Sequence, residues 1–262
     1  SSNPNLQNIP IRTKLGSRIR KAFIPENKET QVLLSADYSQ IELRLLAHCS
    51  GDENLIHAFK SGEDIHAQTA AKVFDVELND VTKEMRSKAK AVNFGIVYGQ
   101  TRYGLASALG ISNAEAQMFI DKYFETYPKV KEYMENSIQE AYRNGYAKTM
   151  YGRKRYLLDE LMSSNHNIKE FAQRAAINTP LQGAASDLIK LAMIDLDKKL
   201  ESNNLKSKMI MQVHDELIIE TYKDELEKVK ELTKEAMELN QPLLVPLVVD
   251  MEWGSSWLEE EE

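Results

Sequence analysis

The chain has 262 residues, of which 42% are hydrophobic and 28% charged, and its formal net charge is −7. This length suffices for one large domain or two smaller ones, and the composition is ordinary for a globular protein. No apolar stretch approaches the roughly 18 residues that span a bilayer, and no signal peptide is visible. Because Cys49 is the single cysteine, an internal disulfide is excluded, and a reducing cytoplasmic compartment is expected rather than secretion.

The negative charge is unevenly distributed, so it does not exclude a nucleic-acid partner. Residues 221–262 contain four lysines and twelve acidic residues, whereas residues 1–30 contain six Lys or Arg and two Glu. Local fields, more than net charge, decide where a polyanion binds. A positive surface must therefore be confined to a cleft. The chain opens with Ser1 instead of methionine, so we expect it to be part of a longer protein.

Hydrophobic periodicity predicts strands near both ends of the chain and helices between them. We expect extended chain with short strands over residues 1–30, because turn signals are frequent there. Residues 31–36 form a short apolar run that predicts a buried strand ending at Asp37, and residues 40–49 show helical spacing. A helix-rich stretch is expected from about residue 53 to residue 144.

The second half of the chain returns to strands after one long helix. The predicted elements are a hairpin or turn over residues 147–158, a helix over 167–200 that could bend at Pro180, a hairpin over 208–222, an amphipathic helix over 224–239 and a closing strand over 244–249. These elements predict an α+β fold, in which a mixed or antiparallel sheet from both ends of the chain carries an inserted helical subdomain.

Two acidic sites at strand ends are candidates for a metal centre. Asp37 follows one apolar strand, and Asp215-Glu216 lies between the two apolar runs of a predicted hairpin. If these strands are neighbours in one sheet, the carboxylates converge, and hard oxygen ligands of this kind suit Mg²⁺ and phosphoryl transfer. By spacing alone, a helix cap at Asp37 and a polar turn at Asp215 are the simpler interpretation.

A stripe of cations and aromatics runs along the helix predicted at about residues 83–99. Arg86, Lys90, Phe94 and Tyr98 are spaced four apart, so they share one helix face. The two cations could hold a triphosphate, and the two rings could stack on a base or sugar. An ordinary amphipathic helix, with buried rings and solvated cations, would show the same spacing.

A second polar row lies on the predicted long helix. Arg174, Asn178 and Gln182 are again four apart, and such side chains can read acceptors in the minor groove of DNA. A merely polar helix face is the common alternative. His66 follows Asp64-Ile65, and an isolated histidine in this setting is more often a surface or capping residue than a ligand.

Several ordered segments together resemble family A DNA polymerases. Asp37 to Arg44 resembles their motif A, Arg86 to Gly99 their motif B, and Gln212 to Glu216 their motif C. Asn5 to Pro10 and Arg174 to Gln182 are similar to two further family segments. The segments occur in the family order across nearly the whole chain, which makes the probability of a chance similarity very small.

The resemblance implies a role for each matching residue in the chemistry and in nucleotide binding. Asp37 and Asp215 would ligate two Mg²⁺ ions (or Mn²⁺ in their place) with the backbone carbonyl of Tyr38, and Glu216 would act nearby. Lys90 would hold the triphosphate and protonate the leaving pyrophosphate. The other implied nucleotide-binding residues are Arg86 and His66 at the phosphates, Phe94 and Tyr98 at the base and sugar, Glu42 against the 2′ position, and Gln40.

The resemblance also implies the DNA contacts and the domain plan. The primer-template contacts would be Arg174, Asn178, Gln182, Gln212, His214, Asn5, Gln7, Asn8 and Arg12. The plan is a palm whose first part spans residues 1–50, fingers over 51–165, and the second part of the palm over 166–262. Family members also carry a thumb and usually an exonuclease-like domain, so the isolated chain is expected to bind primer-template weakly.

The resemblance predicts template-directed DNA synthesis from deoxynucleoside triphosphates by a monomer of bacterial or phage origin without membrane attachment. A truncated fragment that binds nucleotide or DNA without efficient catalysis is the alternative from another class, although the presence of both Asp37 and Asp215 favours catalysis. A template-independent or RNA-making polymerase is a third reading, and Glu42 argues against RNA synthesis.

Overall fold

The computed structural model describes residues 9, 14–238 and 243–257. They form two compact units, which are described separately. The first unit holds the described residues up to 39, from 186 to 238 and from 247 onward, and the second holds residues 40–185 and 243–246. The palm and fingers boundaries at residues 50 and 165 stay predictions, since the compact units divide at 39/40 and 185/186.

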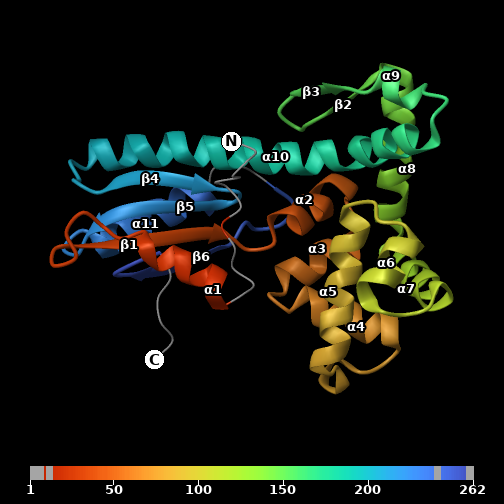
Figure 1. The fold of residues 1–262 in the computed structure, drawn as a ribbon, viewed down its shortest axis with the longest axis horizontal. Coiled ribbons are helices and arrows are strands. Elements are labelled where there is room, and N and C mark those ends of the chain that lie inside the picture. The colour runs from red at the N-terminus through yellow and green to blue at the C-terminus, as the bar shows by residue number, and fades with distance from the viewer. Residues whose placement is uncertain (1–8, 10–13, 239–242, 258–262) are drawn as a thin grey trace. The chain divides into compact units, whose positions relative to one another are not determined.

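The first unit is built on a four-stranded antiparallel sheet with the strand order β4-β5-β1-β6 (Figure 1). The strands are β1 (Gln31–Tyr38), β4 (Lys208–Val213), β5 (Glu216–Tyr222) and β6 (Val249–Gly254). Strand β1 lies between β5 and β6, so a strand from the N-terminal part of the chain pairs on both sides with strands from the C-terminal part. The predicted hairpin over residues 208–222 is confirmed.

Alternation along β1 separates the two faces of this sheet. Leu34, Ala36 and Tyr38 are buried, and the hydroxyl of Tyr38 donates to the carbonyl of Met237 in helix α11 (Leu226–Glu238) at 2.8 Å. On the other face, Leu33 packs with Trp257 and Ile218 in a separate apolar cluster. Because side chains alternate with period two, Asp37 shares the face of Leu33. The predicted amphipathic helix over 224–239 is confirmed as α11.

The second unit is helical, and its helices begin where the sequence supplies caps. Its helices are α2 (Ile41–Ser50), α3 (Glu53–Lys60), α4 (Ile65–Phe74), α5 (Lys83–Val97), α6 (Arg102–Leu109), α7 (Asn113–Thr126), α8 (Pro128–Asn144) and the short η2 (Leu78–Asp80) and α9 (Leu158–Leu161). Asp52, Asp64 and Thr82 cap α3, α4 and α5 through their side chains. The hairpin of β2 (Tyr146–Lys148) and β3 (Lys154–Tyr156) confirms the predicted turn region.

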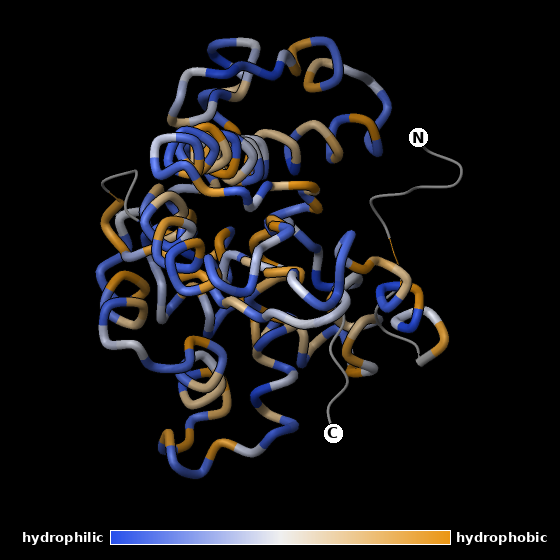
Figure 2. Tube along the Cα trace, turned by 90° about the vertical axis from the view of Figure 1, so that its left-hand side faces the viewer, coloured by the Kyte–Doolittle hydropathy of each residue, from blue (hydrophilic) through white to orange (hydrophobic). Residues whose placement is uncertain are grey.

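Helix α10 (His166–Ser202) confirms the predicted long helix and continues through Pro180. Its early residues Ala172, Ala175 and Ala176 pack into a small apolar cluster with Leu157 and Leu161 of the second unit. Polar and apolar residues interleave along the helices (Figure 2). Within the described ranges, no helix is both long and apolar enough to cross a membrane.

The sequence predictions need three corrections. Residues in the expected extended segment 1–30 form helical turns, α1 (Lys14–Ser17) and η1 (Arg18–Ala22). Strand β1 does not end at Asp37 but includes Tyr38, because Tyr38 pairs with Val249. The closing strand is Val249–Gly254 instead of 244–249.

The last correction has a physical cause. Proline lacks the N–H that a strand interior needs, and Pro246 interrupts the apolar run that predicted the strand. Its carbonyl instead accepts a hydrogen bond from Nη1 of the buried Arg44 in α2 at 2.7 Å. Residues 243–246 therefore belong to the helical unit, and the strand begins after them.

Candidate functional site

Three carboxylates stand in register across the sheet of the first unit. Asp37 in β1 is the direct partner of Glu216 in β5 and of Asp250 in β6. Directly opposite residues on antiparallel strands project from the same face, and like charges in these positions repel. The end of the sheet therefore carries negative charge that a bound cation would compensate. We call Asp37, Asp215, Glu216 and Asp250 the acidic edge.

A tight turn brings Asp215 to the same end of the sheet. Val213 pairs with Glu216, so His214 and Asp215 form a two-residue connection between β4 and β5. His214 adopts a left-handed backbone with φ of 55°, which non-glycine residues adopt rarely. The backbone N–H of Tyr38 donates to the carbonyl of Asp215 at 3.2 Å. This hydrogen bond holds Asp215 at the end of β1, because Tyr38 directly follows Asp37 in the sequence.

Glu216 is held by its neighbours. Its Oε1 accepts from the Ser35 hydroxyl at 2.5 Å and from the indole N–H of Trp257 at 2.7 Å. Its Oε2 lies 3.7 Å from Nη1 of Arg20, whose guanidinium also covers the Trp257 ring. With both oxygens engaged, Glu216 is a poor direct ligand and is better suited to shape the field around Asp37.

The electrostatics of the acidic edge follow from this arrangement. Partial burial of its carboxylate, followed by repulsion from Asp215, Glu216 and Asp250, raises the pKa of Asp37 to about 7, and Arg20 opposes the rise. Burial also raises the pKa of Asp215, with Glu216 adding to the rise and His214 opposing it. Both carboxylates are therefore costly to ionise unless positive charge is supplied.

The acidic edge fits a divalent cation that takes part of its coordination from elsewhere. Among the residues that the structure describes, no three or more His, Cys, Asp or Glu side chains gather closely enough to hold a metal by themselves. Mg²⁺ characteristically keeps several waters and binds through one or two carboxylates plus substrate phosphates. Asp37 and Asp215 are two carboxylates at the same end of the sheet, and a cation between them would relieve their repulsion.

In the second unit, the predicted stripe lies along helix α5. Arg86 and Lys90 are exposed, and the side chain of Lys90 forms no ion pair or hydrogen bond with any described residue. The rings of Phe94 and Tyr98 lie nearly parallel, with centroids 6.3 Å apart. Tyr98 caps the C-terminus of α5 and is 42% exposed. The stripe offers positive charge at one end and open aromatic surface at the other.

His66 lies beside this stripe as a buried, neutral ring. It is 3% exposed, and burial, with Lys90 and Arg86 nearby, lowers its pKa to about 4 although Asp64 opposes the shift. Its Nδ1 is 2.9 Å from the side-chain nitrogen of the fully buried Asn93. If that amide donates, the histidine proton is on Nε2. The Phe94 ring lies 5.8 Å away.

The row on α10 meets the end of α5. The amide of Asn178 donates to the backbone carbonyl of Tyr98 at 3.4 Å. Gly99 has φ of 63°, and a Cβ there would lie 3.1 Å from Cγ of Arg174, so glycine permits this close approach. Gln182 is exposed. The structure therefore brings Arg174 and Asn178 beside Tyr98 within the second unit.

The remaining predicted residues are spread over both units. Gln212 donates to the carbonyl of the exposed His214 at 2.5 Å in the first unit. Gln40 has a left-handed φ of 54° before α2, and Glu42 lies half-buried in its first turn. Strained backbone at such positions is typical of functional sites. Asn5, Gln7, Asn8 and Arg12 lie outside the described residues.

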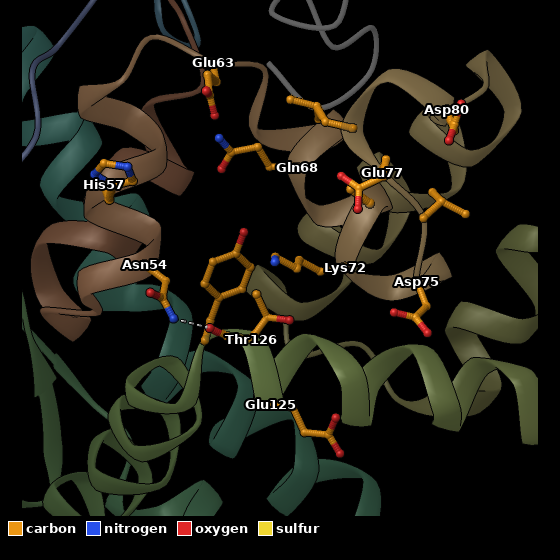
Figure 3. Close-up of a pocket in the computed structure, with 14 residues that line it drawn as sticks. Asn54, His57, Glu63, Gln68, Lys72, Asp75, Glu77, Asp80, Glu125 and Thr126 are labelled. Carbon is orange, nitrogen blue, oxygen red and sulfur yellow. Dashed lines mark hydrogen bonds between the residues drawn. The ribbon is translucent and has the colours of Figure 1, made fainter.

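The second unit also contains a wide hollow of about 1000 Å³ between α3, α4, η2 and α7 (Figure 3). Its labelled side chains include one lysine, Lys72, and five carboxylates: Glu63, Asp75, Glu77, Asp80 and Glu125. Because this surface is acidic, it repels phosphate groups. The hollow is therefore a poor nucleotide site despite its size, and the α5 stripe is the better one.

Several contributing residues were missed at the sequence level. Asp250 becomes visible only through its register with Asp37, and Asn93 only through its contact with His66. Asp64 was seen as a neighbour of His66, but not as the ion-pair partner of Arg86. The only sequence signal was the position of Asp64 directly before a helix, which is typical of an N-cap.

Comparison with known proteins places these observations in a family. The DNA polymerase family A model matches residues 1–259. DNA polymerase I of Caldicellulosiruptor bescii is 57% identical over 259 residues, and that of Bacillus subtilis is 54% identical. These matches cover 99% of this chain, which spans about 30% of the length of these relatives.

A solved structure gives the same result for the fold. The POL domain of Pol1 from M. smegmatis, in complex with DNA primer-template and dNTP, matches with a TM-score of 0.92 and 45% sequence identity. The match covers 98% of this chain and 45% of that one. The matched family model and the identity to these relatives establish that this chain belongs to DNA polymerase family A.

Proposed function

We propose that this chain carries out template-directed DNA synthesis, adding deoxynucleotides to the 3′ end of a primer and releasing pyrophosphate. The observation that carries the proposal is the acidic edge, where Asp37 and Asp215 meet at the end of one sheet. Membership of family A and the nucleic-acid complex of the related POL domain support it. We further propose that residues 1–50 and 166–262 act as the palm and residues 51–165 as the fingers.

In this proposal Asp37, Asp215 and the carbonyl of Tyr38 hold two divalent metal ions. When bound, such ions lower the pKa of the primer 3′-hydroxyl and neutralise charge on the phosphates. Glu216, held by Ser35, Trp257 and Arg20, adds negative potential without taking a ligand position. The raised pKa of Asp37 supports this role, since an unliganded pair of carboxylates is electrostatically unfavourable.

The α5 stripe would bind the incoming nucleotide. Arg86 and Lys90 bind the triphosphate, and Lys90 gives a proton to the leaving pyrophosphate. A neutral His66 donates a hydrogen bond from Nε2 to the triphosphate. A donating Asn93 amide at Nδ1 would fix the tautomer that carries its proton on Nε2. Phe94 and Tyr98 pack against the base and sugar, and their nearly parallel rings present flat surface for that contact.

The remaining residues would set sugar selection and DNA register. Glu42 excludes a ribose 2′-hydroxyl, with Gln40 beside it at the start of α2. Replacing Glu42 by Ala is therefore expected to raise ribonucleotide incorporation, and an unchanged preference for deoxynucleotides would remove this role. Primer-template contacts come from Arg174, Asn178, Gln182, Gln212 and His214, which carry amide and cationic groups suited to minor-groove acceptors.

Primer extension on a short primer-template with Mg²⁺ and four deoxynucleotides tests the proposal. The chain is compared with Asp215→Ala and with a matched control, Asp224→Ala, which removes an exposed carboxylate of the same unit outside the acidic edge. We expect extension by the chain and the control and none by Asp215→Ala. Equal extension by all three would overturn the metal assignment.

Binding measurements would identify the cause if the unaltered chain showed no primer extension. If the unaltered chain does not extend a primer, binding of labelled primer-template and of deoxynucleotide is measured separately. Nucleotide binding without DNA binding would identify weak DNA affinity of this chain as the cause. Binding of neither would contradict the proposed function and also the alternative, a fragment that binds nucleotide or DNA without efficient catalysis.

A further inference from the structure

Asp64 joins the N-termini of two helices in the second unit through its two carboxylate oxygens. It is the N-cap of α4, where Oδ1 accepts from the backbone N–H groups of His66 at 2.9 Å and Ala67 at 3.1 Å. Its other oxygen, Oδ2, accepts from Nε of Arg86 in the first turns of α5 at 2.6 Å. One carboxylate therefore fixes the start of α4 and the side chain of Arg86 at once.

The geometry of this contact determines which donors of Arg86 are left. A guanidinium has five N–H donors, one on Nε and four on the terminal nitrogens. Asp64 engages the Nε donor, and no described residue accepts a hydrogen bond from the terminal nitrogens. Arg86 is thus anchored near its base while the part of the fork that suits phosphate oxygens stays available.

The charges around this contact agree with an anchoring role. Burial alone would raise the pKa of Asp64, but the Arg86 hydrogen bond and the amides of Ala67 and His66 together lower it. Asp64 therefore remains an anion at neutral pH. Lys90, one turn further along α5, has no such anchor among the described residues. Of the two proposed phosphate-binding cations, only Arg86 is held in place.

We propose that Asp64 is a positioning residue for the nucleotide triphosphate, holding Arg86 by Nε so that its terminal nitrogens face the phosphates. The inference rests on the proposed function, because it assumes that Arg86 binds the triphosphate. Asp64 does not touch the nucleotide in this arrangement. It acts by removing rotamer freedom from Arg86 before binding, which lowers the entropic cost of ordering the side chain.

The test is Asp64→Asn. Asparagine is among the best N-cap residues, but its single carbonyl oxygen cannot serve both the cap and Arg86. We expect the KM for the incoming deoxynucleotide to rise roughly fivefold, a modest change because the pair is solvent-exposed. We expect kcat to change less than about twofold, since anchoring acts on binding. Asp64→Ser, which also keeps a cap without the anion, should behave alike.

Two comparisons separate anchoring from capping and from a general charge effect. Glu84→Gln removes the same charge from the first turn of α5 but breaks only a pair with Lys88, and its KM should match that of the unaltered chain. In an Arg86→Ala background, Asp64→Asn should have no further effect on KM. Equal rises for Glu84→Gln and Asp64→Asn, or additive effects of Asp64→Asn and Arg86→Ala, would overturn the proposal.

Nucleotide binding distinguishes failure of this inference from failure of the proposed function. The same variants are titrated with a fluorescent deoxynucleoside triphosphate and with inorganic tripolyphosphate, without primer. If the unaltered chain binds both probes and also primer-template but extends no primer, the proposed function fails, while the Kd values still decide the role of Asp64. An unchanged or tighter Kd for Asp64→Asn refutes anchoring, and absence of binding by the unaltered chain refutes both ideas.

Discussion

The acidic edge of the first unit brings like charges together, whereas the α5 stripe of the second unit pairs a cation with a carboxylate. At the acidic edge, Asp37 faces Glu216 and Asp250 on neighbouring strands, so like charges repel. On α5, Arg86 faces the carboxylate of Asp64 at 2.6 Å, so opposite charges attract. The first region stores an electrostatic cost in the folded chain, whereas the second has its charge partly compensated.

The difference follows from what each region is proposed to bind. A site for a divalent cation must present carboxylates with few internal partners, and repulsion between them is the consequence. A site for a flexible triphosphate benefits from a cation that is already oriented, and an internal carboxylate can provide that. We therefore expect removal of a carboxylate to have opposite effects on stability in the two regions.

The largest effect is expected for Asp37→Asn on catalysis. Loss of a metal ligand should remove several kcal/mol of transition-state stabilisation and slow single-nucleotide extension by roughly a thousandfold. Rapid-quench measurement with saturating Mg²⁺ and nucleotide gives the rate. A rate within tenfold of the unaltered chain would show that the acidic edge is not the catalytic centre.

The next effect concerns Mg²⁺ and thermal stability. If the acidic edge binds Mg²⁺, adding the ion at about 100 times its Kd should stabilise the chain by roughly 2.7 kcal/mol. Differential scanning fluorimetry across a Mg²⁺ series should show a rising midpoint for the unaltered chain and a much smaller rise for Asp37→Asn. An equal rise in both proteins would place the binding elsewhere.

A smaller effect is expected for the metal-free folded state. The pKa of Asp37 rises from 3.8 to about 7 on folding, so ionisation at neutral pH opposes folding. The resulting loss of stability develops as pH increases from about 4 to about 7 and is complete above 7. Because Asp37 retains solvent access, screening reduces the loss to about 1 kcal/mol.

Asp37→Asn should abolish this loss. Denaturant unfolding in EDTA should show the variant to be more stable than the unaltered chain at pH 8 and equal to it near pH 4. Asp224→Asn is the matched control, since it removes an exposed carboxylate outside the acidic edge. A variant that is less stable at pH 8 would contradict the repulsion on which the comparison depends.

The smallest effect, with the opposite sign, is expected for Asp64→Asn. The pKa of Asp64 is lowered on folding, so its ionised form stabilises the fold above its unfolded pKa, and this contribution is lost as pH falls through the folded pKa. Since both partners are well exposed, the variant should lose about 0.5 kcal/mol at neutral pH. Unfolding in low and in 1 M salt measures it, and salt should shrink the difference.

Local sequence patterns determined most of the secondary structure. The helix α10, the hairpin of β4 and β5 and the amphipathic helix α11 follow from the hydrophobic pattern within each segment. The convergence of Asp37 and Asp215 required that β1 and β5 be neighbours, which they are. Local patterns failed where Pro246 displaced the closing strand and where residues 14–22 became helical.

The sequence by itself determined the strand and helix periods and the ordered motifs that identify the family. Only the tertiary structure decided that Asp250 stands opposite Asp37, that Asn93 contacts His66 and that Asp64 anchors Arg86. Each of these contacts joins separate elements of the chain. Strand order, register and helix packing set them, and those depend on the burial of whole elements, which no local pattern specifies.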